Sequence, residues 1–149
     1  MNQSGTQTQD KKDVEALIES WVVAARIGDV KTILGLYTPD ILAFDAIGSL
    51  QFKGTDAYRK HWEICMSHMS GGEMIMEVHE LDVHVGGDIA FAHYVSLCGG
   101  TDENGKEQTG WMRATVCCQK TANGWRICHE HYSAPFDPET MMMMTDLKP

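Results

Sequence analysis

The stretch that decides the fold lies near the C-terminus and reads Gly124-Trp125-Arg126-Ile127-Cys128-His129-Glu130-His131-Tyr132-Ser133-Ala134-Pro135. It follows the turn signal Asn123-Gly124, is rich in β-forming and aromatic residues, and stops at a proline, which indicates a strand. Successive side chains of a regular strand point to opposite faces of the sheet. We therefore predict one face that leaves an apolar core and enters a polar pocket, formed by Trp125, Ile127, His129, His131 and Ser133. The opposite face is predicted to carry Arg126, Cys128, Glu130 and Tyr132.

Three further long strands precede this stretch. The hydrophobic pattern has a period of two over 73–85, 88–98 and 107–120. The glycine-rich turn signals Gly86-Gly87 and Asn104-Gly105 separate these segments. We expect the four strands to form an antiparallel meander.

The first part of the chain has helical periodicity instead. Asp10 or Asp13 can cap the first helix, and a second, shorter helix cannot continue through Pro39. Two short paired strands are predicted at 41–46 and 50–53, followed by a third helix that Gly71-Gly72 close. Helices and strands that are segregated along the chain indicate an α+β fold. We expect a cone-like, curved antiparallel sheet wrapped around three N-terminal helices.

The composition is that of a single globular domain. The chain has 149 residues, 43% of them hydrophobic, and we divide it into a disordered tail (1–9), one domain (10–138) and a C-terminal tail (139–149). No apolar run approaches the roughly 20 residues that span a bilayer, so no membrane contact is expected. A net charge of −9 without a basic cluster argues against nucleic acid. Five cysteines, an odd number, and a polar N-terminus favour a reduced, cytoplasmic protein.

Asp45 is the first residue that could carry chemistry. It shares a predicted strand face with Ile41 and Ala43, and partial desolvation there suits a general base. The alternative is a turn aspartate at a strand end that binds nearby backbone N–H groups.

His129 and His131 are the second candidates. Two histidines on one strand face can transfer protons or bind a metal. Alternatively, they are hydrogen-bonded groups at a pocket or an interface. A closed metal site would need a third and a fourth ligand. The side chains that could supply them are His79, Glu80, His84 and His93. Their spacing in the sequence is not diagnostic of a metal site, so no metal is predicted.

Arg113 is a third candidate, on the predicted strand 107–120. Its guanidinium could neutralise an anionic substrate or a developing oxyanion, or it could form a structural salt bridge with Glu130 or Asp82. Several aromatic residues are expected to belong to the core and to line a ligand pocket: Trp21, Phe44, Tyr58, Trp62 and Trp111.

The order of these segments resembles the nuclear transport factor two-like superfamily. The resemblance rests on a helix, Gly28-Asp29, a short helix, the segment 37–48, Phe52-Lys53-Gly54 and another helix. This superfamily has a cone-shaped α+β fold shared by ketosteroid isomerase, scytalone dehydratase and the SnoaL-like polyketide cyclases. The closing stretch 124–135 resembles the SnoaL-like, ketosteroid isomerase-homologue branch.

The resemblance implies an aspartate base. The isomerase base lies in an Asp-Pro-aliphatic-Gly segment, which Asp45-Ala46-Ile47-Gly48 matches apart from the proline. The isomerase also has two oxyanion donors, a tyrosine and a protonated aspartic acid. Trp21 stands at the tyrosine position, and the third long strand offers no acid between Glu107 and Lys120. Steroid isomerisation itself is therefore not expected.

These observations predict a small-molecule enzyme of the isomerase, cyclase or lyase type. Asp45 would remove a proton next to a carbonyl group, and His129, His131 or Arg113 would stabilise the anion. The expected partner is a small hydrophobic or carbonyl-containing molecule, and no cofactor is required. The alternative is a non-catalytic module for ligand binding or dimeric association. A homodimer is expected in either case, because the apolar side of the meander needs a cover.

Overall fold

The computed structural model describes residues 3–69 and 74–149, in which three helices and six strands follow one another. The helices are α1 (Gln3–Arg26), α2 (Val30–Gly35) and α3 (Thr55–Ser67). The strands are β1 (Tyr37–Phe44), β2 (Phe52–Lys53), β3 (Ile75–Gly86), β4 (Ile89–Thr101), β5 (Glu107–Thr121) and β6 (Gly124–Ser133). Gly71-Gly72, which were predicted to end the third helix, lie outside the described residues.

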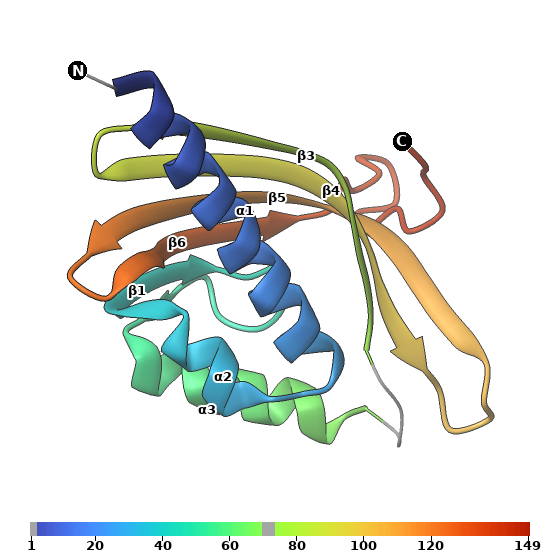
Figure 1. Cartoon of the computed structure of the whole chain (residues 1–149). Coiled ribbons are helices and arrows are strands. Elements are labelled where there is room, and N and C mark those ends of the chain that lie inside the picture. Colours follow the sequence, from blue (N-terminus) through green and yellow to red (C-terminus); the bar gives the residue numbers. More distant parts are fainter. Residues whose placement is uncertain (1–2, 70–73) are drawn as a thin grey trace.

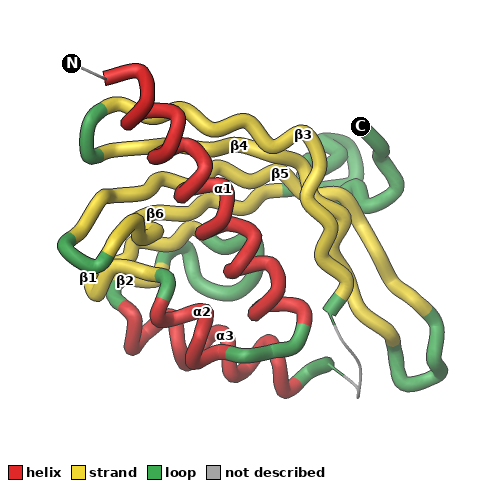
Figure 2. The backbone as a smooth tube through the Cα atoms, in the orientation of Figure 1, coloured by secondary structure: helices red, strands yellow, loops and turns green. Residues whose placement is uncertain are grey.

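The strands pair in the order β2-β1-β6-β5-β4-β3. Figure 1 shows a curved sheet that does not close on itself, with α1 lying across its inner face and α2 and α3 beside β1. Figure 2 shows the same layers, with the helices gathered on one side of the strands. The predicted α+β fold is confirmed. The sheet is mixed, however, because β1 runs parallel to β6 while the other neighbouring strands are antiparallel.

A stripe of buried apolar side chains holds α1 inside the curve of the sheet. Val14, Ile18, Trp21 and Ala25 are at most 2% exposed and recur at helical spacing, as predicted. Burying a large apolar side chain contributes about 1.5–3 kcal/mol relative to leaving it in water. The contacts of α1 with β3 and β6 are where this stripe meets the sheet.

Asp10 lies within α1 and does not cap it. The helix begins at Gln3, so residues 3–9, predicted as part of a disordered tail, are helical. The Oδ1 atom of Asp10 accepts hydrogen bonds from Lys120 Nζ at 2.6 Å and from Trp125 Nε1 at 3.1 Å. The carboxylate therefore ties the N-terminal helix to β5 and β6.

A β-bulge in β6 decides which of its side chains enter the interior. Cys118 of β5 pairs with Ile127, but the preceding residue, Cys117, pairs with His129. Cys128 is therefore an extra residue on the β6 side of the ladder. An extra residue shifts the alternation of the strand by one position, so side chains after the bulge change faces.

The burial of the β6 side chains follows this shift. Trp125, before the bulge, is 4% exposed, whereas after the bulge Glu130 is 0% and Tyr132 is 8% exposed. His129 and His131 consequently lie on the outer face of the sheet. The predicted common face of Trp125 with the two histidines was wrong, because the prediction assumed regular alternation through Cys128.

The chain after β6 folds back on itself without regular structure. Phe136 and Met143 form an isolated bridge, and Met144 N donates to Pro135 O at 2.8 Å. In the two ranges that the structure describes, no helix is both long enough and apolar enough to cross a membrane.

Candidate active site

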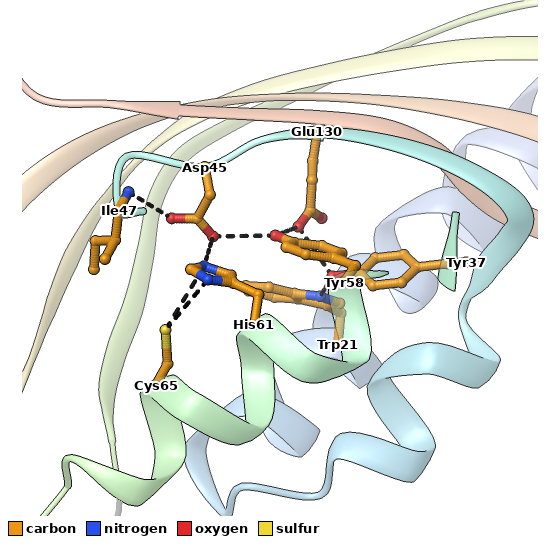
Figure 3. A network of polar contacts seen from close by, with 8 residues as sticks. All are labelled: Trp21, Tyr37, Asp45, Ile47, Tyr58, His61, Cys65 and Glu130. Carbon is orange, nitrogen blue, oxygen red and sulfur yellow. Dashed lines mark hydrogen bonds and ion pairs between the residues drawn. The ribbon is translucent and has the colours of Figure 1, made fainter. Parts of the chain in front are cut away.

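The carboxyl group of Glu130 lies at the centre of a buried polar network (Figure 3). Tyr37 Oη donates a hydrogen bond to Glu130 Oε1 at 2.9 Å, and Tyr58 Oη contacts the same oxygen. Trp21 Nε1 in turn donates to Tyr37 Oη at 2.8 Å. The network thus joins α1, β1, α3 and β6.

Burial raises the pKa of Glu130 to about 7, because the charged form loses its hydration inside the sheet. The hydrogen bonds from Tyr58 and Tyr37 lower the pKa, and the nearby charge of Asp45 raises it. Burial also raises the pKa of Tyr37 and of Tyr58 well above the ordinary value of 10.0. The two tyrosines therefore remain neutral donors, while Glu130 can gain or lose a proton near neutral pH.

Asp45 immediately follows β1 and reaches the same network from its more exposed end. Its Oδ1 accepts a hydrogen bond from the backbone N–H of Ile47 at 3.0 Å, as predicted for a turn aspartate. Its Oδ2 lies 3.2 Å from Tyr58 Oη and 3.2 Å from His61 Nε2. The side chain of Asp45 is 17% exposed. The turn geometry and the contacts of a potential base therefore occur in the same residue.

The imidazole of His61 is held in place from two sides. The ring of Phe52 stacks on it with 4.2 Å between the centroids. Cys65, one helical turn further along α3, places its Sγ 3.6 Å from His61 Nε2. Tyr58 and His61 are three residues apart on α3, a spacing that puts both side chains on the face of the helix towards Asp45.

The hydroxyl group of Tyr58 connects the two carboxyl groups. It has one proton, but it lies within hydrogen-bonding distance of both Asp45 Oδ2 and Glu130 Oε1. When Glu130 carries a proton, both contacts can be hydrogen bonds, with Glu130 donating to Tyr58 and Tyr58 donating to Asp45. The geometry therefore provides a path for a proton between a buried carboxyl group and a partly exposed one.

Three buried side-chain atoms have no hydrogen-bond partner in the described part of the chain: Thr38 Oγ1, Trp62 Nε1 and Glu130 Oε2. Buried polar groups are paired in most proteins, so such atoms need an explanation. The indole N–H of Trp62 lies close enough to the Tyr37 hydroxyl to lower its pKa. Trp62 and Glu130 thus offer one donor and one acceptor that a bound polar group could satisfy.

Comparison with known proteins identifies the family. The profile of the SnoaL-like domain matches residues 14–137. The chain belongs to the SnoaL-like domain family. It is similar to the crystal structure of an NTF2-like protein of unknown function from Pseudomonas putida KT2440, with 46% identity, a TM-score of 0.87, and coverage of 95% of this chain and 98% of that one. The predicted superfamily is thereby confirmed.

Two more distant structures share the fold of this SnoaL-like domain. A ketosteroid isomerase-like protein from Erwinia carotovora atroseptica SCRI1043 is 20% identical, with a TM-score of 0.70 and coverage of 83% of this chain and 95% of that one. The association domain of C. elegans CaMKII is 21% identical, with a TM-score of 0.70 and coverage of 87% and 98%. A search of curated proteins gave no match.

The predicted pocket residues of the SnoaL-like domain divide between the two faces of the sheet. Trp21, Tyr58 and Trp62 are interior and at most 7% exposed. The ring of Trp21 packs edge-on against Trp62 at 5.8 Å and stacks on Tyr132 at 5.9 Å between centroids. These rings adjoin the network around Glu130, where they exclude water from it.

The other predicted site residues lie on the outer face. Phe44 packs its ring edge-on against His129 at 4.8 Å and against His131 at 5.6 Å. His129 Nδ1 also lies 2.7 Å from Leu42 O, so the alternative of a simply hydrogen-bonded histidine describes it well. Phe44 was therefore wrongly placed in the interior, because the residue after it, Asp45, is the one that points inward.

Trp111 and Arg113 also point outward. The buried face of β5 carries Ala114, Val116 and Cys118, and these alternate with Trp111 and Arg113. Trp111 packs against His79 on the outer face, at 5.1 Å between ring centroids. Their expected place beside Asp45 was wrong, since the small side chains of β5 are the ones that make room for the interior rings.

Three residues of the network were not predicted from the sequence. Glu130 was assigned to the wrong face, and nothing in the local sequence marks the bulge at Cys128 that turns it inward. Tyr37 and His61 carry a weak signal, because each is a polar aromatic residue next to an apolar helical or strand stripe. The group of side chains whose spacing suits a metal ion, among the described residues, lies elsewhere, on β3 and β4.

Proposed function

We propose that this SnoaL-like domain is an acid–base enzyme of the isomerase, cyclase or lyase type, with Asp45 as the general base. The observation that supports this most directly is the position of Asp45 Oδ2, 3.2 Å from both His61 Nε2 and Tyr58 Oη. These contacts orient the carboxylate, and the water-poor surroundings strengthen them. The similarity in fold to a ketosteroid isomerase-like protein agrees with this class of reaction.

The proposed reaction begins with removal of a proton next to a carbonyl group. The C–H bond breaks, Asp45 takes the proton, and the electron pair moves to the carbonyl oxygen to form an enolate. The buried N–H of Trp62, which also lies near the Tyr37 hydroxyl, is the proposed donor to that oxygen, in place of the outward-facing His129, His131 and Arg113. Return of the proton to another carbon gives an isomerase, and loss of a leaving group gives a lyase. Glu130 supplies or stores a proton through Tyr58.

The proposed substrate is a small hydrophobic molecule with a carbonyl group. The side chains around the network are mostly aromatic, which suits an apolar ligand, while its few polar atoms suit one oxygen. The five cysteines are free thiols, which supports our proposal of a cytoplasmic protein.

The test is deuterium incorporation from D2O at the carbon next to the carbonyl, followed by NMR across a panel of aryl ketones and cyclic enones. Asp45→Asn should lower the rate by at least about 100-fold, the usual loss when a general base is removed. Asp40→Asn is the matched control, because Asp40 lies exposed on β1. Unchanged exchange in Asp45→Asn would contradict the assignment of Asp45.

A second candidate function, dimeric association, is supported by the outer face of β4. Ile89 and Phe91 are neighbours there and are 54% and 46% exposed, and the partly exposed Val95 and Leu97 follow on the same face beyond His93. Exposed apolar groups that adjoin one another favour a contact with another protein surface. We propose that a second copy of the chain covers this face, and the shared fold with a kinase association domain agrees with this role.

Analytical ultracentrifugation tests the proposed homodimer. The unmodified chain should sediment as a dimer, and Phe91→Asp should give a monomer, because the charge would be buried without a partner. Ile64→Asp is the control, since Ile64 is similarly exposed, at 57%, but lies on α3. A monomeric unmodified chain, or a dimer that survives Phe91→Asp, would contradict the proposed interface.

A further inference from the structure

A group of three metal-ligating side chains lies on the outer face of β3 and β4, on the opposite side of the sheet from Glu130. We propose that Asp82, His84 and His93 bind a divalent transition-metal ion of the Zn²⁺ type. One ligand atom from each side chain lies within 4.8 Å of the other two. This site is separate from the proposed acid–base network and does not depend on it. It adjoins the proposed dimer contact, because Phe91 stacks on His84, so the metal-site variants are compared at the same oligomeric state.

A β-bulge in β3 creates this arrangement. His79 pairs with Val95 and Asp82 pairs with His93, so β3 contains one residue more than β4 between these two pairs. Glu80, inside the bulge, has a φ of 56°, which is uncommon for a residue with a side chain. After the bulge, Asp82 points outward and lies directly across from His93.

The distances fit the first coordination sphere of zinc. Asp82 Oδ2 lies 2.9 Å from His84 Nε2 and 3.9 Å from His93 Nε2. Zinc binds these atoms at about 2.0–2.2 Å, so ligand atoms in a tetrahedral site are roughly 3.4 Å apart. The two observed distances bracket this value. The side chains are 49–54% exposed, so small rotations can complete the geometry without disturbing the core.

The chemical types of the ligands select the class of metal. Two imidazoles and one carboxylate suit zinc and its neighbours in the first transition series, whereas Mg²⁺ and Ca²⁺ prefer oxygen ligands. Three protein ligands leave a fourth position for water, as in zinc sites that remain open. The ring of Phe91 stacks on His84 at 4.8 Å between centroids and fixes one of the imidazoles.

The register of the sheet separates this site from the other outer-face histidines. Asp82, His93, Thr115 and His131 follow one another across β3, β4, β5 and β6. Thr115 therefore stands between His93 and His131, and the ligands come from β3 and β4 alone. The net charge of −9 favours a cation, although the charge of Lys11, which acts on Asp82, opposes it.

Isothermal titration of the tag-free chain with ZnCl₂ tests the proposal. We expect one Zn²⁺ per chain with a dissociation constant on the order of 1 µM. Each of Asp82→Asn, His84→Gln and His93→Gln should weaken binding at least about tenfold, because each removes one ligand. These side chains are exposed, so the variants should keep the circular dichroism spectrum of the unmodified chain.

His79→Gln is the matched control, because His79 is also exposed on the outer face of β3 but is not one of the three ligands. It should bind Zn²⁺ like the unmodified chain. Co²⁺ in place of Zn²⁺ should give the visible spectrum of a four-coordinate ion, and His93→Gln should lose that spectrum. Binding that is absent, or that is equally weakened by His79→Gln and His93→Gln, would overturn the assigned site.

Discussion

The inner and outer faces of the same sheet differ sharply around two adjacent residues, Glu130 and His131. Glu130 is fully buried and bonded to two tyrosines, whereas His131 is exposed and packs its ring in an edge-to-face contact with Phe44. On the inner face, burial raises the pKa of a carboxyl group to about 7. On the outer face, solvated imidazoles lie beside exposed apolar groups.

The difference shows that the position of a β6 residue relative to the bulge, and not its residue type, decides whether its side chain enters the interior. Histidine is usually the side chain that exchanges protons near neutral pH. In β6 a glutamate gains that property, because the extra residue Cys128 turns it inward, where burial raises its pKa to about 7. A carboxyl group surrounded by buried aromatic rings can thus exchange a proton near neutral pH, as an imidazole does in water.

Deletion of Cys128 tests whether this residue is only the extra member of the ladder. Without it, regular alternation from Ile127 still places His129 outward and Glu130 inward, and the pairs with β5 on either side are kept. We therefore expect a cooperatively folded protein, as measured by circular dichroism during urea unfolding. Cys128→Ser keeps the bulge and is the control, with a change in the free energy of unfolding of about 1 kcal/mol or less. A deletion variant that does not fold would show that the bulge does more than set the faces.

Truncation to alanine should lower the free energy of unfolding much more at position 130, on the inner face, than at position 131, on the outer face. Glu130→Ala leaves the hydroxyls of Tyr37 and Tyr58 without their acceptor and opens a cavity, so the free energy of unfolding should fall by about 3–5 kcal/mol. His131→Ala should change it by less than about 0.5 kcal/mol. Urea unfolding of both variants measures the contrast, and equal losses would contradict the assigned burial.

The pH dependence of stability should come from the inner face. The pKa of Glu130 is about 7 in the folded protein, against an ordinary value of 4.5. Between these values the folded chain keeps a proton that the unfolded chain has lost, so the free energy of unfolding falls as the pH rises through this range. The expected loss is about 3 kcal/mol. Glu130→Gln should remove it, and an unchanged decline in that variant would place its origin elsewhere.

Removal of the Tyr58 hydroxyl should lower the free energy of unfolding by less than Glu130→Ala does, and it should affect function more than stability. Tyr58→Phe removes the link between Asp45 and Glu130, with a loss of about 1–2 kcal/mol in the free energy of unfolding. The proposed deuterium exchange should fall with it. Tyr94→Phe is the control, because Tyr94 Oη bonds Tyr132 Oη at 3.0 Å within the same interior. A similar loss of exchange in both variants would mean that the path through Tyr58 has no special role.

The fold was predictable because its signals are long and periodic. The helical stripe with Val14, Ile18 and Trp21 and the alternation of the long strands both depend on burial that repeats over many residues. The parallel pairing of β1 with β6 was not predicted, because it joins segments distant in the sequence and has no local pattern. The start of α1 at Gln3 was not predicted either, because the polar residues 3–9 have only a weak preference for the helix.

The candidate site was predictable only in part. The inward position of Asp45 was predicted, because an acidic residue at the end of an apolar strand is conspicuous, and the burial of Trp21, Tyr58 and Trp62 was predicted from helical spacing. The predicted inward position of His129 and His131 was wrong, because a single extra residue in a strand reverses the face of every side chain after it. Bulges carry no reliable signature in one sequence. Glu130, which Tyr58 links to Asp45, could therefore be placed in the interior only from the register of β5 and β6.

The most direct test of the central claim is infrared titration of the Glu130 carboxyl group in the folded protein. A protonated carboxyl group has a C=O absorption that the ionised form lacks, and comparison with Glu130→Gln isolates this residue. We predict that this absorption is present at pH 5.5 and disappears with a midpoint of about 7, as burial beside Tyr37 and Tyr58 requires. A carboxyl group already ionised at pH 5.5, about one unit above its ordinary pKa, would contradict the proposed store of a proton next to Asp45.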